Sequence, residues 1–210
     1  MKNPLISVVI PAYNSEKTIS KCLSSLLNQS YDNYEIIVVD NNSKDSTKDI
    51  INHFKSKSKK IKMVFEPFVS RGAARNAGIS ASKGKIIAMI DSDCIAPKEW
   101  IEKITFPIRK HKETVVQGNE TDHIKNYWTG MEQEFNNEFL QKNRYGRYID
   151  HLDTKNCAFK KNIFKGIGPF NKHIKNIEDF ELKVRINKKG IKVFFLKILA
   201  VYSIFTKALA

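Results

Sequence analysis

The first 90 residues alternate between short apolar runs and amphipathic segments, and this alternation restricts the fold more than any other feature of the sequence. The apolar runs predicted to be strands occupy positions 6–10, 36–39, 61–65 and 86–90. Between them, apolar residues recur three and four positions apart, which predicts helices over 19–27, 47–57 and 73–82. Runs that are apolar on both faces are typical of strands buried in a parallel sheet. The pattern therefore predicts an α/β fold of right-handed βαβ units, with an open twisted sheet flanked by helices.

The pattern is weaker after position 96. It predicts a helix from Pro97 to about Phe106, a strand over Thr114–Gln117, a helix over Glu178–Lys189 and a final strand over Ile191–Leu196. Four large apolar residues keep helical spacing in the middle of this stretch: Trp128, Met131, Phe135 and Phe139. We interpret this stripe as core or as the wall of an acceptor site rather than a cofactor site. With 210 residues the chain is long enough for one domain with a full core, and we predict a single domain.

The chain is strongly basic, with 36 Lys and Arg against 22 Asp and Glu and a formal net charge of +14. Such a surface attracts anionic partners, which include nucleic acid, anionic lipid and phosphorylated substrates. Lysine-rich runs such as 55–62 fit a solvated surface equally well. Charge alone therefore leaves the class of partner open.

The cysteines and the apolar tail bear on the compartment. Cys22, Cys94 and Cys157 form no CxxC pair, so neither a zinc site nor a disulfide framework is indicated, and we expect a reducing environment. The start of the chain has no signal-peptide pattern. The apolar stretch 191–210 contains three lysines, too many for a span of ~20 mainly apolar residues. We therefore expect a cytoplasmic protein without a transmembrane helix.

Polar clusters follow three of the predicted strands directly, at Pro11–Asn14, Asp40–Asn42 and Asp91–Asp93. Open α/β sheets bind ligands at the carboxyl ends of their strands, so these clusters should converge on one edge. Two carboxylates one residue apart at the end of a buried strand are costly unless water or a cation neutralises them. Mg²⁺ and Mn²⁺ prefer oxygen ligands and share their coordination with substrate phosphates. The sequence therefore favours a divalent metal site over the alternative of a solvated turn.

Five segments, in their order along the chain, resemble those of the inverting family 2 glycosyltransferases, which have the GT-A fold. The segments are Val9–Asn14, Val38–Thr47, Arg75–Gly78, Asp91–Asp93 and Glu178–Asp179. Each is weak alone, but together they are specific and extend over nearly the whole chain. The resemblance implies a Rossmann-like, mostly parallel GT-A sheet with a nucleotide-sugar-binding half over 1–96 and a small acceptor-binding half over 97–210.

The same resemblance implies a reaction: metal-dependent, inverting transfer of a sugar from a nucleotide diphosphate sugar to a hydroxyl. A UDP-sugar is the expected donor, and a glycan or lipid-linked molecule is the expected acceptor. The family's habits place such reactions in surface polysaccharide assembly.

Donor-binding roles fall, by resemblance, on seven residues: Pro11, Ala12, Tyr13, Asp40, Arg71, Asp91 and Ser92. The first three would form a wall against the nucleotide base, Asp40 would accept a hydrogen bond from it, and Arg71 would lie near the base or the phosphates. Asp93 would ligate Mn²⁺ or Mg²⁺, with Asp91 contacting the ribose or, through water, the metal. Without the resemblance, Tyr13, Asp40 and Arg71 fit a strand-end aromatic, a turn aspartate and a surface arginine.

The general base is expected in the acidic pair at the start of the last predicted helix. The family pattern favours the second acid, so Asp179 is the first candidate and Glu178 the second. The alternative is that the pair only interacts with the helix dipole.

Two departures from the family concern the second half of the chain. A motif of Gln or Arg followed by Arg-Trp is absent, and Val201-Tyr202 stands where some relatives have a histidine that helps to hold the metal. Residues 115–175, which should line the acceptor site, match no pattern that identifies a sugar or an acceptor.

Three other functions fit parts of the sequence. A basic nucleic-acid-binding protein fits the net charge, but the sequence has no helix-turn-helix, RNP or zinc-finger pattern. A nucleotidyltransferase that forms the sugar nucleotide usually carries a glycine-rich basic loop after its first strand, where this chain has Tyr13–Glu16. A relative that binds the donor without catalysis is the third. The basic surface and the lysine-bearing apolar tail also suit peripheral contact with the inner face of an anionic membrane, where lipid-linked acceptors reside.

Overall fold

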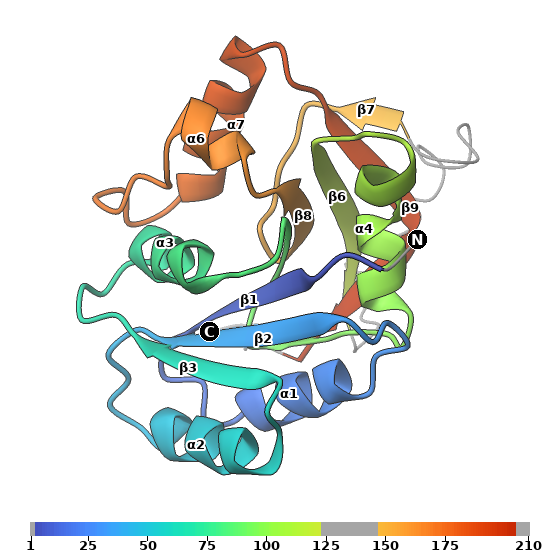
Figure 1. The fold of residues 1–210 in the computed structure, drawn as a ribbon. Coiled ribbons are helices and arrows are strands. Elements are labelled where there is room, and N and C mark those ends of the chain that lie inside the picture. Colours follow the sequence, from blue (N-terminus) through green and yellow to red (C-terminus); the bar gives the residue numbers. More distant parts are fainter. Residues whose placement is uncertain (1–2, 123–146, 205–210) are drawn as a thin grey trace.

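The computed structural model of the protein describes residues 3–122 and 147–204. The strands are β1 (Ile6–Ala12), β2 (Tyr34–Asp40), β3 (Ile61–Phe65), β4 (Ile86–Ile90), β5 (Cys94–Ile95), β6 (Val115–Asp122), β7 (Arg147–Ile149), β8 (Asn156–Lys160) and β9 (Val193–Ser203). The helices are α1 (Ile19–Leu27), α2 (Thr47–Lys57), α3 (Arg71–Ala81), α4 (Trp100–Lys110), α6 (Ile163–Ile167) and α7 (Glu178–Lys188). All nine strands join one sheet in the order β3-β2-β1-β4-β8-β6-β9-β5, with β7 paired to β9 (Figure 1).

The first half of the chain forms the parallel part of this sheet. Strands β1 and β2, β2 and β3, and β1 and β4 pair in parallel, and each is connected to the next along the chain by a helix. The predicted βαβ units are therefore confirmed, and β4 has the bounds that the sequence predicts.

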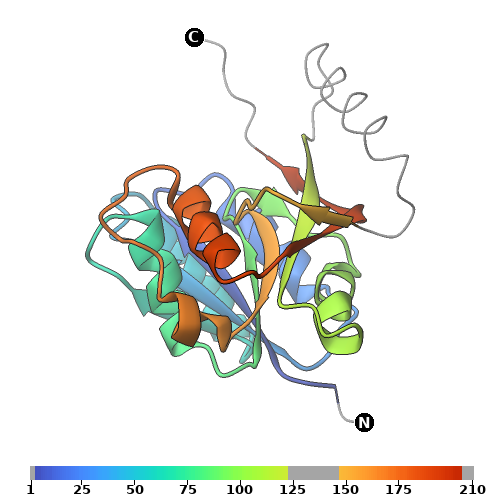
Figure 2. The ribbon, with the colours of Figure 1, turned by 90° about the horizontal axis from the view of Figure 1, so that it is seen from above.

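The side chains of these strands alternate between two apolar layers. In β1, Val8 and Ile10 pack into a core shared with α1, α2 and α4, while Val9 packs on the other face with residues of α3, α6 and α7. Figures 1 and 2 show α1 and α2 together on one side of the sheet, and α3, α6 and α7 on the other. Burial on both faces is the physical reason why these strands read as continuous apolar runs.

The second half of the chain adds antiparallel and parallel strands to the same sheet. Strand β8 lies antiparallel to both β4 and β6, and β6 pairs in parallel with β9. The sequence prediction missed β5, β7, β8 and α6, which are short and, in β8, flanked by polar residues.

Three predicted elements after position 96 are present with shifted bounds. The predicted helix at Pro97 begins three residues later, because Trp100 N donates to Pro97 O and the segment between them is a turn. The predicted strands at 114–117 and 191–196 overlap the starts of the longer β6 and β9, which begin one and two residues later. The apolar stripe at Trp128, Met131, Phe135 and Phe139 lies outside the described residues.

Two expectations about the compartment can be compared with the structure. Cys22, Cys94 and Cys157 are buried thiols that are not joined by disulfide bonds. Over the ranges 3–122 and 147–204, none of the helices has the length and apolarity that crossing a bilayer requires.

Candidate functional site

The loops after β1, β2 and β4 lie at one edge of the sheet, as the rule for parallel strands predicts. Ala12 at the end of β1 pairs with Asp40 at the end of β2, which in turn pairs with Phe65 at the end of β3. We call this the carboxyl edge, and define it by Pro11–Ser15, Asp40–Thr47, Glu66–Arg71 and Asp91–Asp93.

The loops after β1 and β2 are held together by hydrogen bonds from side chains to the backbone. Asn14 accepts at Oδ1 from Lys44 N at 2.8 Å, and its own N–H donates to Ser43 Oγ at 3.1 Å. The N–H of Ser15 donates to Thr47 Oγ1 at 2.7 Å. These contacts fix the loop that presents Tyr13, whose side chain is 49% exposed.

A serine pair joins the first loop to the acidic loop after β4. Ser15 Oγ and Ser92 Oγ lie 2.8 Å apart, and both residues are buried. The sequence prediction gave Ser92 a donor-binding role but did not identify Ser15. A small hydroxyl residue shortly after a strand end is too common for sequence alone to single it out.

Asp40 and Asn41 organise the loop after β2. Asp40 is only 1% exposed and accepts from Ser43 N at 3.1 Å, which closes the turn. Asn41 donates to the carbonyl oxygens of Glu66 and Phe68 and accepts from Ser70 N, all at 2.8–2.9 Å. The segment before α3 is therefore tied to β2, and Arg71 lies exposed at the first position of α3.

The site also contains a buried cation, Arg75 on α3, which is 2% exposed. Its Nη2 donates to Asp91 Oδ1 at 3.2 Å, and its Nη1 forms a short ion pair with Oε1 of the equally buried Glu178. One guanidinium thus links the acidic loop to the start of α7. The sequence analysis named Arg75 only as part of a motif. Its place on the buried face is marked by Gly72 and Ile79, three and four positions away.

Asp93 lies beside Asp91 and is partly buried. Burial raises the pKa of the Asp93 carboxyl, and the charge of Asp91 raises it further. Its Oδ1 accepts a weak hydrogen bond from Cys94 Sγ at 3.5 Å. A cation would relieve this like-charge arrangement, so these two acids fit a divalent metal that keeps waters and substrate phosphates as its other ligands. No group of three or more His, Cys, Asp or Glu suited to a metal occurs in the part of the chain that the structure describes.

The end of β9 lies directly against this acidic loop. Strand β5 pairs Ile95 with Tyr202, and Ile204 N donates to Asp93 O at 2.7 Å. The segment in which some relatives have a metal-binding histidine is therefore next to Asp93, and Tyr202 is 44% exposed there.

Asp179 occupies the first turn of α7. The residue before the helix, Ile177, has φ of 60° and is 66% exposed, a left-handed conformation that is costly for a β-branched residue. Asp179 is partly exposed and accepts from Phe180 N at 2.8 Å. Glu178, the second candidate base, is instead buried in its ion pair with Arg75.

The buried thiol of Cys157 on β8 shows how closely these charges gather. Burial raises its pKa well above the usual value, and the positive charge of Arg75 opposes this effect. The carboxylates of Asp91 and Asp179 both act on the same thiol and raise its pKa further. Groups from α3, α7 and the loop after β4 are therefore near one point of the sheet.

The chain is similar in sequence to known glycosyltransferases. The model of the family described as glycosyl transferase family 2 matches residues 7–168. The chain is similar to glycosyltransferase AglE of Haloferax volcanii, with 31% identity over 197 residues, 91% of this chain and 64% of AglE. It is also similar to the poly(ribitol-phosphate) beta-glucosyltransferase of Bacillus spizizenii, with 48% identity over 93 residues, 42% of this chain and 14% of that protein.

Two solved structures share the fold. Mannosyltransferase PcManGT from Pyrobaculum calidifontis, in complex with GDP-Man and Mn²⁺, aligns with a TM-score of 0.81 at 17% identity, over 100% of this chain and 59% of that one. TarS 1-349 of S. aureus, in complex with UDP-GlcNAc, aligns with a TM-score of 0.77 at 20% identity, over 97% of this chain and 59% of that one. These alignments confirm the predicted GT-A fold. The chain spans less than two thirds of the length of each of these four proteins.

Proposed function

Because the chain belongs to glycosyl transferase family 2, we propose that it transfers a sugar from a nucleotide diphosphate sugar to a hydroxyl group of an acceptor. The observation that carries this proposal is the linked set of groups at the carboxyl edge. Ser15 and Ser92 join the first loop to the acidic loop, and Arg75 joins the acidic loop to the start of α7. These bonds support a common site for the residues that we propose to bind the donor and to act as acid and base.

The donor would lie across the loops after β1, β2 and β4. The exposed ring of Tyr13, with Pro11 and Ala12 behind it, offers a flat surface for the base. Asp40 would accept from a base N–H, and Arg71 would attract the phosphates. A UDP-sugar is the proposed donor. One structural neighbour binds UDP-GlcNAc, which agrees with this choice, and another binds GDP-Man.

Asp93, with Asp91, would hold Mn²⁺ or Mg²⁺. The bound metal would supply positive charge to the diphosphate as it leaves. The structural neighbour PcManGT carries Mn²⁺ together with its donor, which supports the same chemistry here.

Asp179 is the proposed general base. Its carboxylate would take the proton of the acceptor hydroxyl, whose oxygen forms a bond to the anomeric carbon while the bond from that carbon to the diphosphate breaks. Attack from the face opposite the diphosphate inverts the anomeric configuration. Glu178 would keep α7 in position through Arg75 rather than accept the proton.

The setting of the reaction completes the proposal. Residues 1–96 would bind the donor and 97–210 the acceptor, a glycan or a lipid-linked molecule. The protein would act in the cytoplasm, in contact with the inner face of an anionic membrane, during assembly of a surface polysaccharide.

Donor choice and catalysis can be tested separately. Thermal unfolding in the presence of UDP-, GDP- or dTDP-sugars, with and without Mn²⁺, should show the largest stabilisation for UDP-sugars with the metal. Asp179→Asn should then lower the rate of transfer by about 10²–10⁴-fold while leaving donor affinity nearly unchanged, because only proton removal is lost.

A matched control is Asp49→Asn, which removes an exposed acid from the first turn of α2 and should leave transfer unchanged. Retained turnover in Asp179→Asn would place the base elsewhere. Formation of a sugar nucleotide from a nucleoside triphosphate and a sugar phosphate would point to the nucleotidyltransferase alternative.

A further inference from the structure

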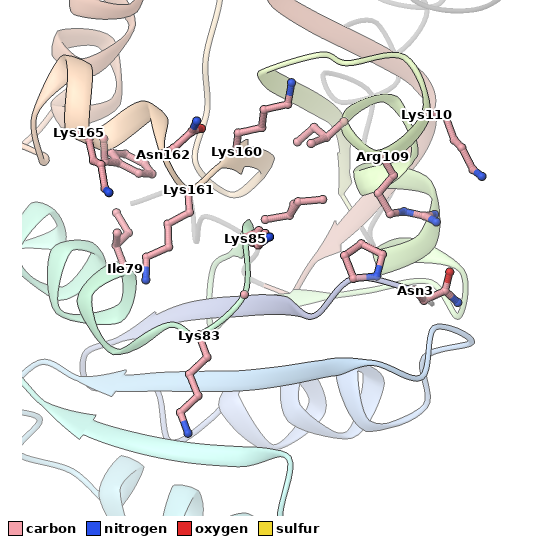
Figure 3. A pocket seen from close by; sticks show the side chains of 15 residues that line it. Asn3, Ile79, Lys83, Lys85, Arg109, Lys110, Lys160, Lys161, Asn162 and Lys165 are labelled. Carbon is pink, nitrogen blue, oxygen red and sulfur yellow. The ribbon is translucent and has the colours of Figure 1, made fainter. Parts of the chain in front are cut away.

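A basic pocket lies at the amino edge of the parallel strands, opposite the proposed donor site. Its cavity volume is about 880 Å³. The lining comes from the start of the chain, the α3–β4 connection, the end of α4 and the segment from β8 into α6 (Figure 3). Its members are Asn3, Pro4, Ile79, Lys83, Gly84, Lys85, Ile86, Ile108, Arg109, Lys110, Lys160, Lys161, Asn162, Phe164 and Lys165.

The strand register separates this pocket from the acidic loop. Ile86 is the first residue of β4 and pairs with Ile6 at the start of β1 and with Lys160 at the end of β8. Asp91 follows the other end of β4, which is five residues long. At ~3.3 Å per residue the two sites are about 17 Å apart, so one nucleotide sugar at the acidic loop does not fill the pocket.

The pocket concentrates positive charge. Seven of its lining residues are Lys or Arg and none is Asp or Glu. Lys160 and Lys161 donate to backbone carbonyls, and Arg109 to Thr105 and Glu102 O. The ammonium groups of Lys83, Lys85, Lys110 and Lys165 have no hydrogen-bond or ion-pair partner among residues 3–122 and 147–204. Figure 3 shows the side chains of Lys83 and Lys110 directed away from the middle of the pocket, so the charge available to a ligand comes from the other lining cations, whose mutual repulsion an anion would reduce.

The connection that carries Lys83 and Lys85 is fixed in place. Lys83 N donates to Glu35 Oε1 at 2.6 Å, and Gly84 N donates to Ser7 Oγ at 2.8 Å. A Cβ at Gly84 would lie 2.7 Å from Leu5 O, so the chain here approaches β1 as closely as glycine allows. The backbone that carries the two lysines is therefore a rigid turn.

Apart from Asn3 and Asn162, the uncharged part of the lining is apolar, which distinguishes this pocket from a simple phosphate site. Pro4, Ile79, Ile86, Ile108 and Phe164 contribute to it. A ligand that satisfies both parts carries a phosphate next to a hydrocarbon group, as a phospholipid does. Phe164 is the only aromatic residue of the lining, which gives a nucleic acid little on which to stack its bases.

We propose that this pocket binds the phosphate headgroup of an anionic membrane lipid and so holds the protein on the bilayer. This proposal assigns a specific site to the membrane contact described under the proposed function. It rests on the proposed function only for the expectation that the protein acts at a membrane. It can be tested without donor or acceptor, so its failure would leave the transferase proposal standing, and failure of the transferase proposal would leave vesicle binding intact.

The test compares two double variants with the same net charge. Lys85→Gln/Lys165→Gln neutralises two pocket lysines, and Lys55→Gln/Lys59→Gln neutralises two exposed lysines in and after α2. Binding to vesicles of phosphatidylglycerol and phosphatidylcholine is measured by cosedimentation at low salt. Each lysine at an anionic bilayer contributes a factor of about five in affinity, so the pocket variant should bind roughly 30-fold more weakly while the control binds like the unchanged protein.

Three results would overturn the proposal. Equal losses in both variants would show that attraction comes from the overall charge. Binding to pure phosphatidylcholine as strong as to the anionic vesicles would exclude headgroup charge. Protection of the pocket lysines from amine labelling by inorganic phosphate, or by RNA, but not by short-chain phosphatidylglycerol would identify a site for a soluble phosphate or a nucleic acid instead.

Discussion

The two edges of the parallel strands differ in both charge and construction. At the carboxyl edge, Asp91 of the loop after β4 and Glu178 of α7 pair with one buried arginine, and side chains bond to the backbone of neighbouring loops. At the amino edge, short connections present lysines without an acidic partner in the pocket lining. The net charge of +14 is thus not spread evenly, and the sheet keeps opposite charges at opposite ends of β4. The proposed function would place a metal and a diphosphate at the first edge, and the proposed lipid phosphate would lie at the second.

Removing the arginine should have the largest effect on the carboxyl edge. Arg75→Met leaves Glu178 buried without its ion-pair partner, and should lower the free energy of unfolding by about 4 kcal/mol. Urea unfolding followed by circular dichroism measures this loss. In the double variant Arg75→Met/Glu178→Gln, no unpaired buried charge remains, so about half of the stability should return. A loss below ~1 kcal/mol in the single variant would show that Glu178 is readily neutralised or hydrated.

The second prediction compares one amide at each edge. Asn41→Asp removes the donors to Glu66 O and Phe68 O, and should cost about 2 kcal/mol because two partly buried hydrogen bonds are lost. Asn33→Asp, the matched control at the amino edge, removes one exposed bond to Asn3 O and should change stability by less than ~0.5 kcal/mol. If urea unfolding gave equal losses of unfolding free energy for the two variants, side-chain bonds to the backbone would not stabilise the carboxyl edge more than the amino edge.

The smallest effect concerns Glu35, an acid next to the basic pocket. Burial alone would raise the pKa of its carboxyl, but the hydrogen bonds from Lys62, Ser7 and Lys83 N outweigh burial and lower the pKa. Its contribution to stability is therefore complete above the unfolded pKa of ~4.3 and is lost as the pH falls through the lower, folded pKa.

The variant Glu35→Gln should accordingly lose about 1 kcal/mol at pH 7, where the charge is present. Between pH 5 and pH 2 its free energy of unfolding should fall less steeply than that of the unchanged protein, because both are uncharged at this position at the acid end. Thermal or urea unfolding across this range measures the two slopes, and parallel slopes would show that Glu35 titrates normally.

The parallel part of the sheet could be predicted from sequence because its information is local. Strand β4 has the bounds predicted for it, since five consecutive apolar residues can be buried on both faces only in the interior of a sheet. Strand β8 could not be found in the same way. Its place in the sheet depends on pairing with β4 and β6. Its first residue, Asn156, can be buried because Trp100 Nε1 of α4 donates to its Oδ1 at 2.8 Å.

The candidate site likewise has a part that could be predicted from local sequence and a part that depends on tertiary packing. That the acids of Asp91–Asp93 should lie near the loops after β1 and β2 follows from strand polarity alone. The ion pairs of Arg75 could not be inferred, because Glu178 is 103 residues away in sequence and the partner is chosen by how α7 packs. The roles of these residues in donor binding, metal binding and catalysis remain predictions.

The shortness of β4 has a consequence for the geometry of assembly. Its five residues separate Lys85 from Asp91, and a strand is too stiff to vary this spacing. If a lipid headgroup occupies the pocket, the distance from its phosphate to the acceptor hydroxyl at the acidic loop would be at most about 17 Å. The length of β4 would then set the distance between the membrane surface and the proposed reaction site. A lipid-linked acceptor would need to extend at least this far from the bilayer before its end could receive a sugar.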